Sequence, residues 1–359
     1  MGLKLILSVG LLGVLSSAAS AEAVWQADDQ SARFCLQNFN AYGPIYASNV
    51  GERTERWTAE LQAKPSCDIV QLQEVWNEGH INQVDSALRS KYSLSAPNRK
   101  ARIGLMSLFK GSIRKEETYS FNVNNEGGLM DGVRNMFNVK KAFHIVTANV
   151  PGLDEDIYFL NTHLHPSSQA VRLTQILDLL NWRLKNQNRK LIISGDFNAS
   201  FDKLEHAFVE STLRVTDSLE QVLGKYPADI CTYCHKNPLS WMNDDHVFDY
   251  VFYSNVGEAK SVLKAVDGRI NLKGTERRPL SDHYGLRIEF SWQEAAITVD
   301  FLTVELERGK AIQVLLQAHE VLKREKGSEF APYKKQIKEL VAQLRNNQGV
   351  FADYFTKSN

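Results

Sequence analysis

Short apolar runs rich in β-branched residues alternate with polar turns between residues 33 and 292. Runs of this length and composition predict β-strands. They lie at Ala32–Asn38, Ile69–Glu74, Gly104–Leu108, Met136–Asn149, Ile157–His163, Lys190–Ser194, Phe248–Tyr253 and Leu286–Phe290. Apolar residues at helical spacing predict helices over Arg53–Leu61 and Gln169–Asn186. Strands interleaved with helices predict an α/β layered sandwich.

The pattern changes after Trp292. Residues 294–326 and 332–347 predict two charged amphipathic helices that are separated near Gly327. A helical stripe is formed by Ile297, Phe301, Leu302, Leu306, Ile312, Leu315, Leu316 and Leu322. Acidic and basic residues are mixed along both segments, so we interpret them as a helical hairpin packed on the main domain. A membrane-surface or partner-binding element is the alternative.

The first 21 residues have the pattern of a secretory signal peptide. Lys4 precedes an apolar run from Leu5 to Leu15, and small residues lead to Ala19-Ser20-Ala21. A charged start, a short apolar core and an Ala-x-Ala exit are typical of such peptides. The run is shorter than the roughly 20 residues that a membrane span needs, although an uncleaved anchor is an alternative. We expect cleavage after Ala21 and a soluble mature protein that is secreted or periplasmic.

Composition and charge narrow the class of protein. Hydrophobic residues make up 43% of the 359 residues and charged residues 23%, which excludes disordered and collagen-like chains. The 42 Lys and Arg residues balance 42 Asp and Glu residues, and loss of Lys4 with the leader leaves a formal charge of −1. A protein that coats nucleic acid needs an excess of Lys and Arg. Such a role is therefore disfavoured, while a local basic groove stays open.

Four cysteines, Cys35, Cys67, Cys231 and Cys234, allow three disulfide connectivities in an exported protein. The sequence does not choose among them. The segment from Cys231 to His235 also matches the pattern of c-type haem attachment. No helical haem-binding pattern surrounds it, so we expect a disulfide or free thiols there.

Six short polar motifs lie at the ends of predicted strands. They are Leu36–Asn40, Leu72–Trp76, Asn161–His165, Ser194–Asn198, Phe248–Val251 and Leu280–Tyr284. Residues just beyond strand ends are where catalytic groups are commonly carried. Each motif is weak alone, and their joint order is what favours a functional interpretation.

Three of these motifs offer hard oxygen ligands. Glu74 and Asp282 supply carboxylates and Asn38 supplies an amide oxygen, which is a set suited to Mg²⁺ or Mn²⁺ rather than Zn²⁺. Glycine at 195 permits a sharp turn, so Asp196 and Asn198, two residues apart, can point the same way.

Two histidines complete the set. His163 and His283 can donate to phosphate oxygens or move protons near neutral pH. A nearby acid fixes the tautomer and orientation of such an imidazole. A metal, amide donors and two histidines around one point are the groups that phosphate-ester hydrolysis requires, because they stabilise charge and activate water.

Each residue also has a simpler interpretation. Asp196 and Asn198 are good helix N-caps, and Glu74 fits an ordinary surface acid. His163 and His165 fit one face of a strand or a zinc pair. Further His and Asp residues would have to follow for a zinc site of that type, and Pro and Ser follow instead.

In their order along the chain, the motifs resemble the endonuclease/exonuclease/phosphatase superfamily, which includes deoxyribonuclease I. The resemblance covers residues from about 33 to 292 and rests on Asn38, Glu74, Asn161-Thr162-His163, Gly195-Asp196 with Asn198, Asp249 and Ser281-Asp282-His283. It implies a four-layer α/β sandwich of two packed mixed sheets flanked by helices. With the C-terminal helical extension added, the expected organisation is a signal peptide (1–21), a catalytic domain (22–292) and the extension (293–359).

Within the superfamily, the sequence is most similar to neutral Mg²⁺-dependent sphingomyelinases. The similar segments are Asp68–Trp76, Gly104–Lys110 with Ile113, Thr162–His165 with the helix that carries Arg172 and Gln175, and Pro279–His283. Family members carry a basic residue before the middle strands, for which this chain offers Arg134, Lys140 or Lys141. The sequence shows no aromatic membrane-inserting hairpin of the kind found in bacterial toxins of the family.

The resemblance assigns a role to each residue. Glu74 would hold the metal, with Asn38 beside it and Asp282 in or near the surrounding shell. His163 and Asn198 would contact the scissile phosphate, and Asp249 would orient His283. We expect His283 to act as the general base while Asp196 places the water and His163 stabilises the leaving oxygen; the alternative is Asp196 as the base.

The resemblance implies a secreted Mg²⁺-dependent phosphodiesterase (Mn²⁺ being the other metal that fits) of sphingomyelinase type, acting on a choline phospholipid at a membrane surface. It would release phosphocholine and a lipid alcohol. The alternatives are a secreted nuclease acting on nucleic acid, a phosphoinositide phosphatase and a catalytically inactive binding module. The formal charge of −1 favours a zwitterionic lipid over DNA. No stable protein partner is implied.

Overall fold

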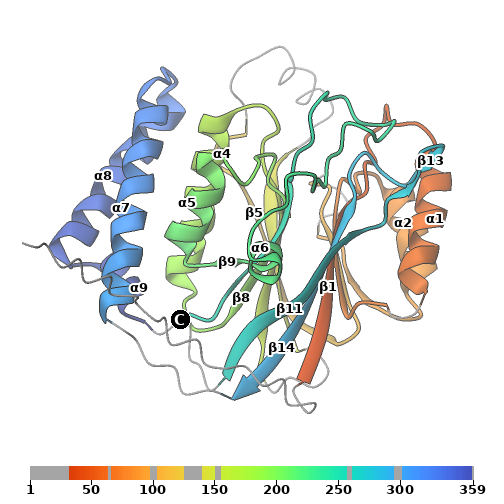
Figure 1. Cartoon of the computed structure of the whole chain (residues 1–359), viewed down its shortest axis with the longest axis horizontal. Helices are drawn as coiled ribbons and strands as arrows, with labels where there is room; N and C mark the ends of the chain where they lie inside the picture. Colours follow the sequence, from red (N-terminus) through yellow and green to blue (C-terminus); the bar gives the residue numbers. More distant parts are fainter. Residues whose placement is uncertain are drawn as a thin grey trace, which may run out of the picture. The chain divides into compact units, whose positions relative to one another are not determined.

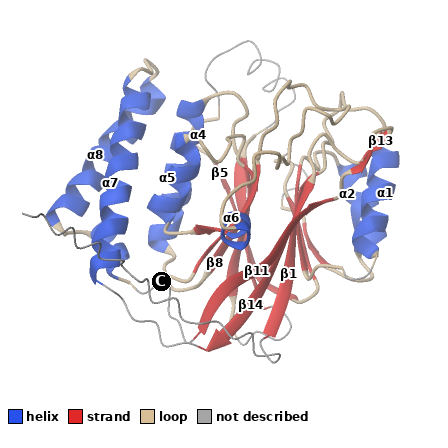
Figure 2. Cartoon of the chain, in the orientation of Figure 1, coloured by secondary structure: helices blue, strands red, loops and turns tan. Residues whose placement is uncertain are grey.

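The computed structural model describes residues 32–63, 66–97, 103–124, 140–149, 155–256, 261–294 and 301–357. The predicted signal peptide, Arg134 and Ile297 lie outside these ranges. In the part from Ala32 to Asn359, two six-stranded sheets form the centre and helices lie on both sides of them (Figure 1, Figure 2). The predicted α/β sandwich with a C-terminal helical extension is confirmed.

The first sheet has the strand order β11-β14-β1-β2-β4-β3. Its strands are β1 (Ala32–Asn40), β2 (Ile69–Gln73), β3 (Ser93–Ser95), β4 (Met106–Phe109), β11 (Ser261–Asn271) and β14 (Gly285–Glu294). Only β1 and β2 pair in parallel. Parallel neighbours need a long crossover, and α1 (Val50–Gln62) supplies it.

The second sheet has the order β5-β6-β7-β8-β10-β9. Its strands are β5 (Ser112–Ser120), β6 (Ala142–Asn149), β7 (Ile157–His163), β8 (Leu191–Asp196), β9 (Thr216–Asp217) and β10 (Asp249–Ser254). Here β7 and β8 form the parallel pair, and the crossover is α4 (Gln169–Lys185). Each sheet therefore contains one β-α-β unit.

Apolar side chains from both sheets fill the space between them. The ring of Phe159 on β7 contacts Phe34 on β1 and Phe109 on β4, with ring centroids 6.4 and 5.3 Å apart. Because these rings are buried, they contribute most of their apolar surface to the core. Strands that are covered on both faces are mostly apolar. Ile69–Gln73 and Leu191–Asp196 are covered in this way, and every residue in them is buried.

Helices complete the layers. The outer face of the first sheet is covered by α1 and α2 (Glu78–Leu88), and the second sheet by α4 and α5 (Leu204–Leu213), as Figure 2 shows. Smaller elements are α6 (Ser218–Leu223), β12 (Gly274–Thr275) and β13 (Arg278–Pro279). No helix in the described ranges has both the length and the apolar character needed to cross a membrane.

The C-terminal segment adds a further helical layer. It contains α7 (Phe301–Lys323), η1 (Ser328–Phe330), α8 (Ala331–Asn346) and α9 (Val350–Thr356), of which α9 was not predicted. The layer packs on α4 and α5 (Figure 1). The predicted apolar stripe is only partly buried: Leu315 and Leu322 face the interior, whereas Phe301, Leu302 and Leu306 are exposed.

The described strands include two long ones that the sequence pattern missed. Both β5 and β11 lie at an edge of their sheet. Edge strands commonly carry charged residues because these discourage pairing with other chains, and Ser112–Ser120 is mostly exposed. Their alternation of apolar and polar residues is therefore too weak to recognise.

The cysteines pair as Cys35–Cys67 and Cys231–Cys234. This is one of the three connectivities that the sequence allowed. It leaves neither Cys231 nor Cys234 with a thiol for haem attachment.

Candidate active site

The predicted site residues meet at one end of the two sheets. From the first sheet, Glu74 follows β2, and Asp282 with His283 precedes β14. From the second sheet, β7 and β8 end in His163 and Asp196, and β10 begins with Asp249, which pairs with Asp196. Ligands in α/β folds bind where the carboxyl ends of parallel strands meet, and both parallel pairs end here.

Glu74 marks one side of the site. Its backbone lies in the left-handed region, with φ of 60°, which costs about 1–3 kcal/mol for a residue with a side chain and is found mostly at functional positions. The amide of Asn40 donates to Glu74 Oε1 over 3.4 Å, and the indole of Trp76 donates to Oε2 over 3.5 Å. These contacts hold a carboxylate at the mouth of the site.

Asn38 lies deeper, in a buried polar network that links the two sheets. Its Oδ1 accepts from Gln73 Nε2 over 2.9 Å, and its Nδ2 faces Asp249 Oδ1 at 3.5 Å. Gln73 also donates to Asn161 Oδ1 over 2.8 Å, and Asn161 donates to the carbonyls of Leu72 and Met106. The amide beside Glu74 is therefore that of Asn40, and Asn38 contacts the acid that faces His283.

A histidine–carboxylate pair joins the sheets. His283 Nδ1 and Asp249 Oδ2 are 2.7 Å apart, and both side chains are buried. The other ring nitrogen, Nε2, lies 3.7 Å from Asp196 Oδ2. Since an Nδ1–H donated to a carboxylate leaves Nε2 with the lone pair, this orientation suits proton abstraction at Nε2.

Asp196 occupies the centre of the site. Its Oδ2 accepts from Asn40 Nδ2 over 3.0 Å and lies 3.4 Å from His163 Nε2. His163 Nε2 is also 3.9 Å from Glu74 Oε1. Asp196 Oδ1 accepts from the backbone N–H of Asn198 over 2.9 Å. One carboxylate thus connects both histidines and the Glu74 side.

The end of β8 and the turn after it are shaped by close packing. A Cβ on Gly195 would lie 2.0 Å from the carbonyl oxygen of Thr162 on β7, so only glycine fits. Asn198 adopts a left-handed φ of 50° and donates from Nδ2 to the Leu164 carbonyl over 3.1 Å. Its amide carries a second N–H, which is the group available for a ligand.

Burial and charge shift the pKa values of three groups. Burial raises the pKa of Asp196 to about 6 and that of Asp282 to about 7; in both, His283 opposes the rise while neighbouring carboxylates add to it. For His283, burial lowers the pKa, but the negative charges of Asp249, Asp196 and Asp282 outweigh burial and hold it well above its usual range. Perturbed groups of this kind cluster at functional sites.

The donor set fits a hard divalent cation. Glu74 carries a partly exposed carboxylate, and repulsion from Glu74 helps to raise the pKa of the Asp282 carboxyl. The amide nitrogen of Asn40 donates to Glu74, while its oxygen accepts from the backbone N–H of Tyr42. A cation among these acids would offset that repulsion. Carboxylate and amide oxygens are the ligands of Mg²⁺ and Mn²⁺, whereas Zn²⁺ prefers nitrogen and sulfur.

The sequence pattern missed several residues of the site. Asn40 lay within a recognised motif, two residues after Asn38, where residues on one strand share a face. Among the described basic candidates, Lys140 is exposed, whereas Lys141 is buried, lies over the Trp76 ring at 5.9 Å and lowers the pKa of Asp196. Arg53 carried no signal, although it is buried and donates to the carbonyls of Ala41 and Tyr42, just after β1, and of Leu280, just before Ser281.

The comparisons with known proteins agree with this architecture. The profile of the Endonuclease/Exonuclease/phosphatase family matches residues 38–283. No curated protein matches the sequence.

Solved structures with a similar fold come from several sources. An endonuclease/exonuclease/phosphatase from Bacteroides vulgatus has a TM-score of 0.59 and 14% identity, over 73% of this chain and 100% of that one. D. rerio TDP2 complexed with a single-strand DNA product has a TM-score of 0.57 and 18% identity, over 72% and 99%. Sphingomyelinase C from Streptomyces griseocarneus has a TM-score of 0.53 and 17% identity, over 72% and 99%. At these identities, the likeness concerns the fold.

Proposed function

Because the chain belongs to the Endonuclease/Exonuclease/phosphatase family, we propose that it is a secreted or periplasmic, metal-dependent phosphodiesterase that hydrolyses a choline phospholipid. The products would be phosphocholine and a lipid alcohol. The predicted signal peptide supports the location. The support for a lipid substrate is a set of exposed apolar side chains near the site.

The apolar rim is defined as four exposed side chains on two loops, Ile45 and Tyr46 just after Tyr42, and Trp241 with its neighbour Met242. They are 80, 73, 79 and 47% exposed, respectively. The indole nitrogen of Trp241 donates to Tyr42 Oη over 3.3 Å, which joins the two loops. Burial raises the pKa of Tyr42, with Trp241 opposing and the charges of Asp282 and Glu74 adding to the rise, so the rim adjoins the carboxylates.

Large apolar and aromatic side chains at such exposure are costly unless a partner covers them. Aromatic rings with a polar edge favour the boundary between lipid and water. The apolar rim therefore suits a substrate presented at a lipid surface, and it is the observation that carries the proposal. It comes from two loops and from no β-hairpin, which is why the sequence pattern did not reveal it.

The metal site would be formed by Glu74 and Asp282, with Asn40 holding the Glu74 carboxylate through its amide nitrogen. When bound, the cation supplies positive charge to the phosphate oxygens and opposes the rise in the pKa of His283. The protein's own groups perform the proton transfer: Asp249 holds the proton on Nδ1 of His283, so Nε2 accepts a proton from the attacking water.

Asp196 Oδ2 lies 3.7 Å from His283 Nε2 and 3.4 Å from His163 Nε2. A water between these groups would be oriented by the carboxylate while its proton passes to His283. His163 and the second amide hydrogen of Asn198 would donate to the phosphate and to the leaving oxygen.

A nuclease is the second candidate function. The specific observation in its favour is again the apolar rim, because bases stack on exposed aromatic side chains such as Tyr46 and Trp241. The formal charge of −1 for the mature chain is the contrary consideration, since nucleic-acid binders attract phosphates with excess basic residues.

The deciding experiment offers the purified mature protein sphingomyelin vesicles, plasmid DNA, single-stranded DNA and a phosphoinositide, each with Mg²⁺ or with EDTA. We expect Mg²⁺-dependent release of phosphocholine from vesicles and intact DNA. Cleaved DNA with untouched lipid would overturn the lipid substrate in favour of the nuclease.

Variants then test the apolar rim. Trp241→Ala should reduce hydrolysis of vesicles about tenfold and leave hydrolysis of a monomeric short-chain substrate unchanged, because only docking is lost. Leu306→Ala is the matched control, since Leu306 is 62% exposed but lies on α7. Equal effects of Trp241→Ala on both substrates would show that the rim does not dock at a lipid surface.

A further inference from the structure

A four-residue segment, Cys231–Cys234, runs beside the start of β10, which carries Asp249, and beside the loop that carries His283. The disulfide between its ends closes it into a small ring. Thr232, Tyr233 and Cys234 are buried. The Cys-x-x-Cys motif of this segment contributes no residue to the proposed proton transfer or metal site.

Thr232 forms hydrogen bonds with the backbone near both members of the histidine–carboxylate pair. Its Oγ1 accepts from the backbone N–H groups of Phe248 and Asp249 over 2.9 and 3.2 Å. Its carbonyl accepts from the backbone N–H of Tyr284, the residue after His283, over 2.6 Å. One residue thus fixes the backbone at Asp249 and next to His283.

Tyr233 contacts the imidazole itself. The two rings are nearly perpendicular, at 69°, with centroids 4.9 Å apart. The phenol oxygen of Tyr233 accepts from the backbone N–H of Trp241 over 2.7 Å. The backbone of Tyr233 pairs with His246 in both directions over 2.9 Å. The phenol ring of Tyr233 is therefore held through its backbone and through its hydroxyl oxygen. In this position it limits rotation of the His283 imidazole.

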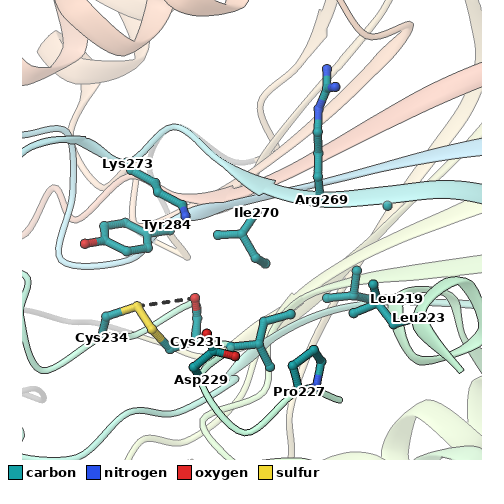
Figure 3. A pocket seen from close by; sticks show the side chains of 12 residues that line it. Leu219, Leu223, Pro227, Asp229, Cys231, Cys234, Arg269, Ile270, Lys273 and Tyr284 are labelled. Carbon is teal, nitrogen blue, oxygen red and sulfur yellow. Dashed lines mark hydrogen bonds between the residues drawn. A yellow bond between two sulfur atoms is a disulfide. The ribbon is translucent and has the colours of Figure 1, made fainter. Parts of the chain in front are cut away.

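On one side, the segment borders a pocket that is lined by residues in the described ranges. Cys231, Cys234 and Tyr284 line a pocket of about 290 Å³, together with apolar residues such as Leu219 and Ile270 (Figure 3). A loop that borders an open pocket lacks packing on that side. The covalent link then supplies the constraint that packing would otherwise give, by reducing the conformations open to the segment.

We propose that Thr232 and Tyr233 are positioning residues for the Asp249–His283 pair and that the Cys231–Cys234 disulfide holds them in place. This inference rests on the proposed function, in which His283 accepts the proton of water. It assigns a role to the Cys-x-x-Cys motif that is separate from metal binding and from substrate contact.

The two disulfides give a matched comparison. The Cys35–Cys67 bond closes a far longer segment, 32 residues against 3 in sequence separation, so its loss should lower the unfolding temperature more. The positioning role predicts the opposite order for catalysis. We expect the double variant C231S/C234S to lose about 10- to 30-fold in kcat with KM unchanged within twofold, and C35S/C67S to keep kcat within twofold.

Single substitutions separate positioning from folding. Thr232→Val removes the acceptor Oγ1 at nearly constant volume and should lower kcat about tenfold, whereas Thr232→Ser keeps the oxygen and should restore it to within threefold. Tyr233→Phe keeps the ring and should stay within threefold, whereas Tyr233→Leu should lower kcat. Full kcat in Thr232→Val or in C231S/C234S would overturn the proposal.

A spectroscopic readout separates this inference from the proposed function. The proton shared by His283 Nδ1 and Asp249 should give a downfield ¹H NMR signal in the wild-type protein, absent in Asp249→Asn. We expect Thr232→Val to broaden or shift it and Thr232→Ser to retain it. If the wild-type protein hydrolyses no substrate while these shifts occur, the proposed function fails and the positioning role stands; an unchanged signal in Thr232→Val overturns the positioning role.

Discussion

Replacing Asp249 by Asn should disable His283 without disturbing its surroundings. Asn38 Nδ2 is a donor that faces Oδ1 of Asp249 at 3.5 Å. An Asn at position 249 would therefore keep its carbonyl oxygen toward Asn38 and turn its amide nitrogen toward His283 Nδ1. Nδ1 must then accept, the imidazole proton moves to Nε2, and Nε2 loses the lone pair that takes the proton of water.

The size of the effect follows from what is lost. A hydrogen bond to a charged group contributes about 1.5–3 kcal/mol, and a well-placed general base contributes roughly 10²- to 10⁴-fold in rate. We expect Asp249→Asn to lower kcat about 10²- to 10³-fold with KM nearly unchanged. The assay is initial-rate release of phosphocholine from sphingomyelin vesicles at saturating Mg²⁺, with folding checked by circular dichroism.

The double variant N38D/D249N is the control for the hydrogen-bond direction. Asp at position 38 still accepts from Gln73, and its second oxygen now accepts from the amide of Asn at position 249, which turns its carbonyl back toward His283. We expect recovery of about tenfold over Asp249→Asn. Full activity of the single variant would refute His283 as the base, and absence of any recovery would refute the tautomer explanation.

Three further predictions concern metal, packing and pH. Glu74→Gln should weaken Mg²⁺ binding by roughly 100-fold in calorimetric titrations, because a charged ligand becomes neutral; unchanged binding would move the metal elsewhere. Gly195→Ala should lower the free energy of unfolding in urea by about 3 kcal/mol, because its Cβ would overlap the Thr162 carbonyl; a loss below about 1 kcal/mol would contradict this. Burial lowers the pKa values of His80 and His144 from 6.5 to about 4. The charge of Arg53 adds to this decrease at His80, and the charge of Glu116 opposes it at His144. The unfolded chain then binds more protons at both histidines between these pH values, so each histidine should contribute a loss of about 2–3 kcal/mol of stability from pH 7 to 4.5. The raised pKa values of Asp196 and Asp282 act in the opposite direction, so the test compares the wild-type protein with His144→Gln. An equal change of the urea midpoint with pH in both proteins would refute the prediction.

The strand ends of the site were predictable from the sequence because they follow a simple physical rule. Buried parallel strands read as apolar runs, and polar residues directly after them, such as Glu74 and Asp196, have few roles other than function or capping. The order of these motifs then identified the family. The two crossover helices were recognisable for a similar reason, since apolar residues at helical spacing mark the buried face.

Other parts depend on contacts between segments far apart in sequence. Asn40 and Asn38 are equivalent in a strand pattern, and only the packing of the sheets shows which one reaches Glu74. Gln73 is polar within a buried strand, where its role is set by partners on other strands. The apolar rim joins residues about 200 positions apart. No local pattern encodes such pairings.

The His283–Asp249 contact links the first sheet to the second. The rate of catalysis should therefore depend on the relative position of the two sheets. A slide of about 1 Å would stretch the 2.7 Å contact beyond the range of a hydrogen bond, while every strand kept its own ladder. The enzyme should therefore lose turnover under mild denaturant or pressure before circular dichroism records any change. Activity would then report small changes in the relative position of the two sheets. Substitutions in the core between the sheets would change the rate, although they lie far from any substrate.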